Sequence, residues 1–294
     1  MDFQGIVQLF INGLAIGSIY AVIALGFVLI YSATNVVNFA QGNFTMVGAF
    51  VFFALYASGI SIWFAFVGSI LIMGVFGFGF QLGVYRPFRN RSKAFLPIIV
   101  STLGASFFLK SLFLVIFGPY PRRVPQLIDG NPVKISGINL SVQYITIFIF
   151  VISLFIFQHL LFEKTNLGKK LQATAQDPET ARLMGIKVVW MDAFTWVYAT
   201  ILGGIAGILL APLFSLTPIV GTVFGLKAFA AAIVGGFSDV KGAIIGGLGI
   251  GVIESFGAYF VSSSYLNAFS FIVLILFLIF KPYGLFGEKV GTKV

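Results

Sequence analysis

The chain has 294 residues, of which 59% are hydrophobic and 9% are charged, and its formal net charge is +9. Water-soluble domains carry about a quarter charged residues, so this chain cannot cover its own surface with polar groups and belongs in a lipid bilayer. The basic residues lie in the gaps between apolar stretches, as the positive-inside rule predicts, which excludes nucleic-acid binding as their explanation. Cysteine is absent and His159 is the single histidine, so no disulfide framework, metal site or cofactor is expected.

Membrane-spanning helices need about 20 apolar residues each. On this criterion we predict an all-α, polytopic membrane helix bundle of about eight transmembrane helices, forming a single transmembrane domain over 1–294. The number of membrane segments is eight or nine, because 214–236 is either one span or a half-helix that re-enters the membrane. The candidate segments are 9–31, 37–57, 62–85, 95–117, 143–162, 192–213, 222–236 with a short return at 237–242, 243–261 and 266–280.

Basic residues in two loops set the expected orientation. Two spans separate the connection at 86–93 from the central loop at 163–191, so both loops face the same side, and their positive charge makes that side cytoplasmic. The same parity places the loop at 118–142 and the N-terminus outside. The residues concerned are Arg86, Arg89, Arg91 and Lys93 in the first loop, and Lys164, Lys169, Lys170, Arg182 and Lys187 in the second.

Glycines are the next feature, with 34 in the chain. Small residues four apart permit close helix packing in lipid, where helices cannot associate by expelling water. The cluster from Gly235 to Gly251 is denser than packing alone requires. It predicts a broken helix whose exposed backbone lines a cavity. The spaced pairs are Gly13/Gly17, Gly79/Gly83, Gly203/Gly207, Gly221/Gly225, Gly242/Gly246 and Gly247/Gly251.

Two polar stretches are candidates for a solute pathway. The stretch 35–48 carries amides and a threonine between apolar spans, and buried amides need partners, which are each other, freed backbone or a passing solute. An ordinary polar turn between spans is the alternative. The stretch 229–247, followed by Glu254, is the second candidate, and a loop with two opposite charges is its alternative. Lys227 and Glu254 are intramembrane ions that we expect to face the bundle interior, whereas Lys110 can reach the outer interface.

The central loop contains two short predicted helices. Leu167, Leu171 and Ala175 recur every four residues and give an apolar stripe. Asp177 and Pro178 are an N-cap and a first helical residue, and Gly185 is a left-handed stop. Short capped helices between two spans are typical of an element on which another protein pushes.

This loop closely resembles the cytoplasmic coupling loop of branched-chain amino-acid permeases, and specifically the leucine/isoleucine/valine H-type subunit of ATP-binding-cassette importers. The resemblance covers nearly the whole chain and is weakest at 118–142. In place of the family's usual His-Gly-Glu the chain has Gln41-Gly42-Asn43, which removes two titratable side chains. The resembling runs are 167–170 and 175–186 in the loop; Asn12-Gly13-Leu14, 17–21, 24–26, 30–31, 38–42 and Gly48 near the N-terminus; and 231–236, 242–247, Gly251 and Glu254 near the C-terminus.

The resemblance implies a permease subunit, not an enzyme, in the bacterial inner membrane. It forms the translocation pathway for leucine, isoleucine or valine delivered by a periplasmic binding protein. The implied partners are a second, paralogous permease and two ATP-binding subunits, since the chain has no phosphate-binding Gly-x4-Gly-Lys-Ser/Thr motif of its own. The pathway residues are expected to be Asn12, Tyr20, Asn38, Gln41, Gly42, Asn43, Thr45, Gly235, Gly236 and Glu254. The ATPase-coupling residues are expected to be Gly168, Ala175, Asp177, Pro178, Ala181, Arg182, Met184, Gly185 and Ile186.

The sequence leaves three alternatives to this interpretation. Related permeases handle urea or short amides, and nothing in the spans excludes these solutes. A stand-alone secondary transporter or channel is less favoured, because ion-coupled carriers usually keep several acids at membrane depth and only Glu254 clearly qualifies here. An intramembrane enzyme is disfavoured, because no paired carboxylates, metal ligands or activated nucleophile can be assembled.

Overall fold

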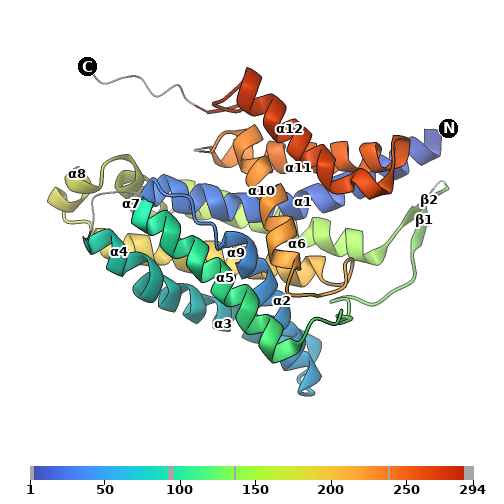
Figure 1. Ribbon diagram of the computed structural model, residues 1–294, viewed down its shortest axis with the longest axis horizontal. Coiled ribbons are helices and arrows are strands. Elements are labelled where there is room, and N and C mark those ends of the chain that lie inside the picture. Colours follow the sequence, from blue (N-terminus) through green and yellow to red (C-terminus); the bar gives the residue numbers. More distant parts are fainter. Residues whose placement is uncertain (1–2, 92–95, 136, 238, 288–294) are drawn as a thin grey trace.

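The computed structural model describes residues 3–91, 96–135, 137–237 and 239–287, and it is a helical bundle (Figure 1). The one sheet among these residues is the hairpin of β1 (Val133–Ile135) and β2 (Ile138–Leu140), paired antiparallel. The helices are α1 (Phe3–Thr34), α2 (Gln41–Ala57), α3 (Ile62–Phe80), the π-helical turn η1 (Gln81–Tyr85), α4 (Arg86–Arg91), α5 (Leu96–Phe117), α6 (Val142–His159), the π-helical turn η2 (Leu160–Lys164), α7 (Asn166–Gln176), α8 (Pro178–Leu183), α9 (Val188–Leu210), α10 (Val220–Gly235), α11 (Val240–Phe260), the 3₁₀ turn η3 (Ser263–Tyr265) and α12 (Leu266–Phe280).

The predicted membrane segments are all present as helices. Within the described part of the chain, seven helical segments are long and apolar enough to cross a membrane. The helices α2 and α10 are also apolar but shorter, with 17 and 16 residues. The ambiguous stretch 214–236 is therefore one short helix that follows an irregular segment. The expected all-α, polytopic architecture is confirmed.

The interior of the bundle is built around α1 and α9. In their most apolar stretches 89% of the residues of α1 and 83% of those of α9 are buried, against 17% in α5 and 6% in the segment that contains α12. α1 packs on α11, α9, α10 and α6, while α2 and α3 pack on α9. The two central helices thus carry the other spans, whose remaining faces are exposed and apolar, as contact with lipid requires.

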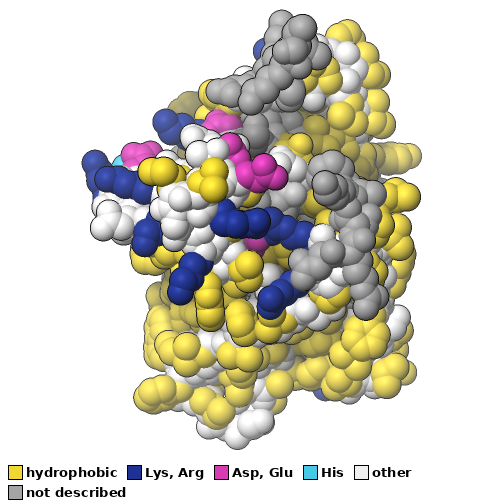
Figure 2. All heavy atoms as spheres, turned by 90° about the vertical axis from the view of Figure 1, so that its left-hand side faces the viewer, with side chains coloured by type: hydrophobic (Ala, Val, Ile, Leu, Met, Phe, Trp, Pro, Cys, Tyr) yellow, Lys and Arg dark blue, Asp and Glu magenta, His cyan; other side chains and the backbone are white. Residues whose placement is uncertain are grey.

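The two predicted loops lie at one end of the bundle. Figure 1 shows α4, α7 and α8 at one end, and the N-terminus with β1 and β2 at the other. An ion pair between Arg89 of α4 and Asp192 of α9 ties the two loop regions together. Lys and Arg side chains gather on this face (Figure 2). We call it the inner end and the opposite one the outer end, following the orientation that the charges predict. Lys93 lies outside the described residues.

Glycines form the tightest helix crossings. A Cβ atom added at Gly17 of α1 would lie 2.8 Å from the carbonyl oxygen of Gly247, and one added at Gly225 would lie 2.6 Å from the Cα of Gly42. Backbones that approach this closely leave no space for a side chain, as small-residue packing predicts. Gly79 and Gly83 differ from the other pairs, because an added Cβ would meet nothing within 4 Å at either position.

Candidate functional site: an outer cavity, a buried ion cluster and the capped inner helices

A cavity of about 330 Å³ opens near the outer end of the bundle. Its walls come from the beginnings of α1, α6 and α12, the end of α11 and Phe214. Three of the predicted pathway residues, Asn12, Tyr20 and Glu254, line it. The Asn12 Oδ1 accepts a hydrogen bond from Gln8 Nε2 at 3.0 Å. The cavity therefore joins a polar amide, a phenol and a carboxylate to apolar walls, which is the usual composition of a small-molecule site.

Glu254 is the centre of a buried polar cluster. Its carboxylate accepts hydrogen bonds from Tyr20 of α1 (2.7 Å) and from Ser270 of α12, and it pairs with the Nζ of Lys227 of α10 at 2.9 Å. Lys227 and Glu254 are 1% and 3% exposed. An ion in such a place needs a partner, and here each ion has one. The expectation that both ions face the bundle interior is confirmed, and the cluster joins four helices.

The polar residues near the start of α2 are buried between helices. Gln41 Nε2 donates to the carbonyl of Ala199 in α9 (3.1 Å), and Asn43 Nδ2 donates to Ser106 of α5 (2.8 Å to the carbonyl and 2.6 Å to Oγ). Asn38 Oδ1 accepts from the backbone N–H of Ala40 at 3.0 Å. These contacts hold the first turn of α2 inside the bundle.

These polar residues do not line the outer cavity. Gly42 packs on α10, and Asn38, Gln41, Asn43 and Thr45 each keep one buried polar atom without a hydrogen-bond partner among the described residues. Their place in a solute pathway stays a prediction. Asn35 is exposed in the turn between α1 and α2, as the alternative of a polar turn between spans predicts, whereas Asn38, Gln41 and Asn43 are 0–2% exposed.

The glycine-rich break between α10 and α11 is a closed hairpin. The prediction of a broken helix is confirmed, since α10 ends at Gly235 and α11 begins at Val240. The prediction that exposed backbone there lines a cavity is wrong for Gly235 and Gly236. Both are buried, Gly235 against Gly242 and Gly236, with φ of 109°, against the backbone of Gly287. The density of glycine serves the close approach of the two helices, and Gly251 alone of the cluster lines the outer cavity.

The central loop folds into the two predicted short helices, α7 and α8. Asp177 accepts hydrogen bonds from the N–H groups of Glu179 (3.0 Å) and Thr180 (3.2 Å), Pro178 is the first residue of α8, and Gly185 adopts a φ of 82°. These caps satisfy the open backbone groups of a helix too short to be stable alone. The predicted N-cap, first helical residue and stop are all confirmed.

One side of this helix pair is anchored and the other is free. Leu171 and Ala181 are 6% and 4% exposed, and Gly168 is buried against the carbonyl groups of Leu161 and Phe162. The exposed side of the helix pair carries Arg182, Leu183 and Met184, and the side chains of Leu183 and Met184 are 88% and 79% exposed. Ala175 lines a cavity at the inner end of the bundle, and Ile186 donates its N–H to the carbonyl of Ala181 at 3.0 Å.

Sequence reasoning missed several members of these sites. Leu183 is exposed and apolar like Met184. Because it directly precedes Met184, it could have been included with Met184 among the predicted coupling residues. Lys227 was singled out as an intramembrane ion, but its partner could not be assigned, because pairing depends on how α10 and α11 cross. Ser270 lies in an apolar helix, and no pattern in the sequence marks it.

Comparison with known proteins decides the family. Residues 9–278 match the family model of the branched-chain amino acid transport system permease component. The chain belongs to this family. BraD of Pseudomonas aeruginosa, named a high-affinity branched-chain amino acid transport system permease protein, is 32% identical over 98% of this chain and 97% of its own length. LivH of Escherichia coli K12, named likewise, is 32% identical over 100% of this chain and 99% of its own length.

A third permease relative comes from Methanocaldococcus jannaschii. This protein, named a probable branched-chain amino acid transport permease protein, is 31% identical over 92% of this chain and 89% of its own length. The permease is a multi-pass membrane protein and a transport subunit, not an enzyme. Family membership agrees with the resemblance carried by the central loop and by the N-terminal and C-terminal runs of the chain.

Proposed function

We propose that this chain is the permease subunit of an ATP-binding-cassette importer that carries leucine, isoleucine and valine across the bacterial inner membrane. The observation that supports this substrate class is the full-length similarity, 32% identity, to proteins named as permeases for branched-chain amino acids. The partners that we propose are two ATP-binding subunits, a periplasmic solute-binding protein and a second, paralogous permease, which supplies the other half of the pathway.

We propose that the short helices α7 and α8 are the docking element for the ATP-binding subunits. Leu183 and Met184 project from the end of α8 and fit an apolar recess on a partner, and Arg182 adds a charge beside them. α7 packs directly on α1 and α9, the two central helices. A push on α8 therefore reaches the core of the bundle through one rigid connection. We propose Gly168, Ala175, Asp177, Pro178, Ala181, Gly185 and Ile186 as the residues that keep this connection rigid.

The outer cavity is the proposed entry to the pathway. The solute-binding protein releases its solute at the outer loop 118–142, whose backbone joins the segment before α10 through a bridge between Arg122 and Leu216. Asn12, Tyr20 and Glu254 then offer polar contacts among the apolar walls. Asn38, Gln41, Gly42, Asn43, Thr45, Gly235 and Gly236 act on the pathway by holding the short helices α2 and α10 in place.

Reconstitution tests this function. The permease is placed in liposomes with its partner subunits, ATP is enclosed on the ATPase side, and uptake of labelled leucine is measured with the solute-binding protein present. We expect uptake that requires both ATP and the binding protein and that excess isoleucine and valine abolish. Arg182→Glu is expected to abolish uptake while docking of the binding protein stays intact.

Three results contradict the proposal. Uptake of urea in place of leucine moves the chain to the short-amide alternative. Uptake without ATP, driven by an ion gradient, favours a secondary transporter. A purified chain with which no ATPase co-elutes removes the basis of the coupling role.

A further inference from the structure

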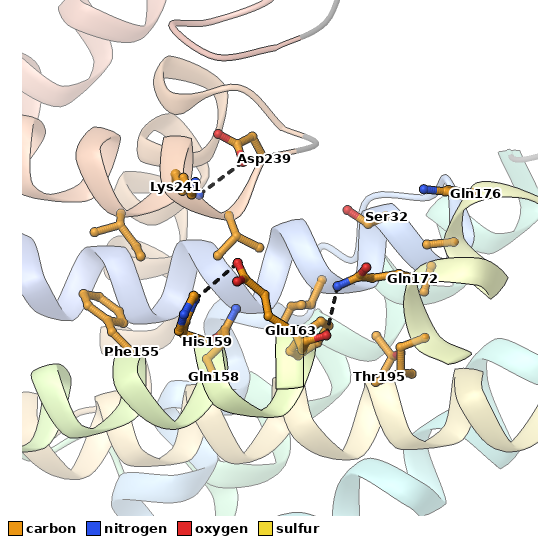
Figure 3. A pocket seen from close by; sticks show the side chains of 17 residues that line it. Ser32, Phe155, Gln158, His159, Glu163, Gln172, Gln176, Thr195, Asp239 and Lys241 are labelled. Carbon is orange, nitrogen blue, oxygen red and sulfur yellow. Dashed lines mark hydrogen bonds and ion pairs between the residues drawn. The ribbon is translucent and has the colours of Figure 1, made fainter. Parts of the chain in front are cut away.

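A second cavity, of about 490 Å³, lies at the inner end of the bundle. It is bounded by the last turns of α1, by α6 with η2, by α7 and by the beginning of α11 (Figure 3). Its size is in the ordinary range of small-molecule sites. No described residue lines both this cavity and the outer one, and α7 forms one of its walls.

Gln158 of α6 is the polar side chain that marks this cavity as a binding site. It is 4% exposed, it lines the cavity, and neither its Nε2 nor its Oε1 has a hydrogen-bond partner among the described residues. A buried amide loses its bonds to water on folding and is costly when nothing replaces them. A ligand that accepts from Nε2 and donates to Oε1 restores both bonds at once.

The charged groups around the cavity are of both signs. His159 Nδ1 and Glu163 Oε1 lie 3.2 Å apart on one wall, and Asp239 and Lys241 lie on the wall across from them (Figure 3). Asp239 caps α11 by accepting from the N–H groups of Lys241 and Gly242, so its carboxylate is fixed in place. The ammonium of a ligand can face Glu163 on one wall while its anionic group faces Lys241 on the other, so a ligand with both charges is matched at both walls.

The remaining lining is apolar and gives the ligand a place for an alkyl chain. Leu29, Phe155, Phe162 and Ile244 contribute this surface, while Gln172 is already committed to the carbonyl of Phe162 at 3.0 Å. We propose that the inner cavity is a second site, which binds a small zwitterion with an ammonium and an anionic group close together and an apolar substituent. A free aliphatic amino acid and the headgroup of phosphatidylethanolamine share this chemistry.

Occupancy of this site acts on the helix pair that we assign to coupling. Leu171, Ala175 and Gln176 of α7 line the cavity, so a bound ligand ties α7 to α1, α6 and α11. This regulatory consequence rests on the proposed function, but binding itself does not. An amino acid that accumulates on the inner side is then expected to slow the transporter that imports it.

The test measures binding directly on the purified transporter, without the solute-binding protein and without ATP. Labelled leucine is titrated onto the wild-type complex and onto three variants. Gln158→Leu is expected to weaken binding by about tenfold or more, since it removes two hydrogen bonds to charged groups. Lys241→Gln, at an exposed position that does not threaten folding, is expected to weaken it several-fold. Gln81→Leu is the matched control, because Gln81 is also buried with an unpaired Oε1 and lines neither cavity.

Further arms separate the two sources of the ligand and the two cavities. Leucinamide and N-acetyl-leucine, which each lack one charge, are expected to compete at least about tenfold more weakly than leucine. If leucine does not bind but phosphatidylethanolamine is retained by wild type and lost by Gln158→Leu in native mass spectrometry, the lipid headgroup is the occupant. Leucine binding that Glu254→Gln abolishes and Gln158→Leu leaves unchanged overturns the proposal, and so does the absence of both ligands. Neither result affects the reconstituted uptake that tests the proposed function.

Discussion

The Nζ of Lys227 lies 2.9 Å from one carboxylate oxygen of Glu254 and 3.0 Å from the other, in the apolar interior of the bundle. Lys227 comes from α10 and Glu254 from α11, and Tyr20 of α1 donates to the same carboxylate at 2.7 Å. The pair thus fixes the relative position of three helices beside the outer cavity. Its effect on stability is set by the cost of leaving one ion without the other.

Breaking this pair from one side is expected to destabilise the bundle strongly. Lys227→Met leaves a buried carboxylate without its cation, which costs about 3–5 kcal/mol. The double variant Lys227→Met/Glu254→Gln removes both charges and is expected to regain most of this loss. Stability is measured as the fraction that remains monodisperse after heating. Lys110→Met, at a half-buried lysine near the outer end of α5, is the control, and a double variant no better than Lys227→Met contradicts the argument.

The crossing of α2 and α10 is expected to tolerate no side chain. In Gly225→Ala the new Cβ would lie 2.6 Å from the Cα of Gly42, so the two helices must move apart. We expect the free energy of unfolding to fall by about 1–3 kcal/mol. Gly249→Ala is the matched change, because a Cβ there meets nothing within 4 Å. Helix propensity favours alanine at that site by up to about 1 kcal/mol. Equal thermal stability of the two variants in detergent is the contradicting result.

The cap of α8 is expected to control how tightly ATP hydrolysis is coupled to transport. Asp177→Ala removes the acceptor for two N–H groups and destabilises the short helix α8 by about 1 kcal/mol. The end of α8 then frays and transmits less of the movement of the ATP-binding subunits to the bundle. Asp177→Asn keeps a capping oxygen and is expected to behave as wild type. The quantity to measure is leucine transported per ATP hydrolysed in liposomes. If asparagine and alanine reduce this ratio equally, charge and not capping is the property that matters.

The exposed end of α8 is expected to be the contact for an ATP-binding subunit. Leu183→Ala and Met184→Ala are each expected to weaken co-purification of that subunit, by about 1–3 kcal/mol where the side chain is fully buried by the partner. Both positions are exposed in the isolated chain, so folding is unaffected. Trp190→Ala, at another exposed apolar side chain nearby at the start of α9, is the comparison variant. Undiminished co-purification of the double variant Leu183→Ala/Met184→Ala rules out this contact.

The orientation can be read with single cysteines, because the chain contains none. Lys170→Cys in α7 is expected to react with a membrane-impermeant maleimide only after the cells are opened, and Asp129→Cys in the outer loop is expected to react in intact cells. Both positions are exposed. Labelling of Lys170→Cys in intact cells places the central loop outside and removes the coupling role.

The sequence predicts where the helices lie along the chain but not which helices pack against one another. Span length located each apolar helix, and the local chemistry of Asp177, Pro178 and Gly185 located α8, because caps depend on a few adjacent residues. Burial was not readable from the same information. The most apolar stretch of α1 has a mean hydropathy of 2.4 and is 89% buried, whereas that of the segment with α12 has 2.1 and is 6% buried. Lipid and protein interior are equally apolar, so composition does not separate a central helix from a peripheral one.

The site was predictable to the same extent. Glu254 and Lys227 stand out because charge at membrane depth is costly, and this cost holds whatever the fold. The role of Gln41 was not predictable, because the distance of its amide from the carbonyl of Ala199 follows from the crossing of α2 and α9. Gln158 sits near the end of an apolar helix, and only the walls supplied by α1, α7 and α11 give it a cavity to face.

The contact of Gly42 with Gly225 also bears on how the protein is made. The polar start of α2 finds its partners on α9 and α10, which the ribosome delivers more than a hundred residues later. Until then the Gln41 amide cannot form its hydrogen bond to Ala199, whereas Asn43 finds its partner, Ser106, on the earlier helix α5. The start of α2 therefore reaches its complete set of contacts only after α9 and α10 have been synthesised.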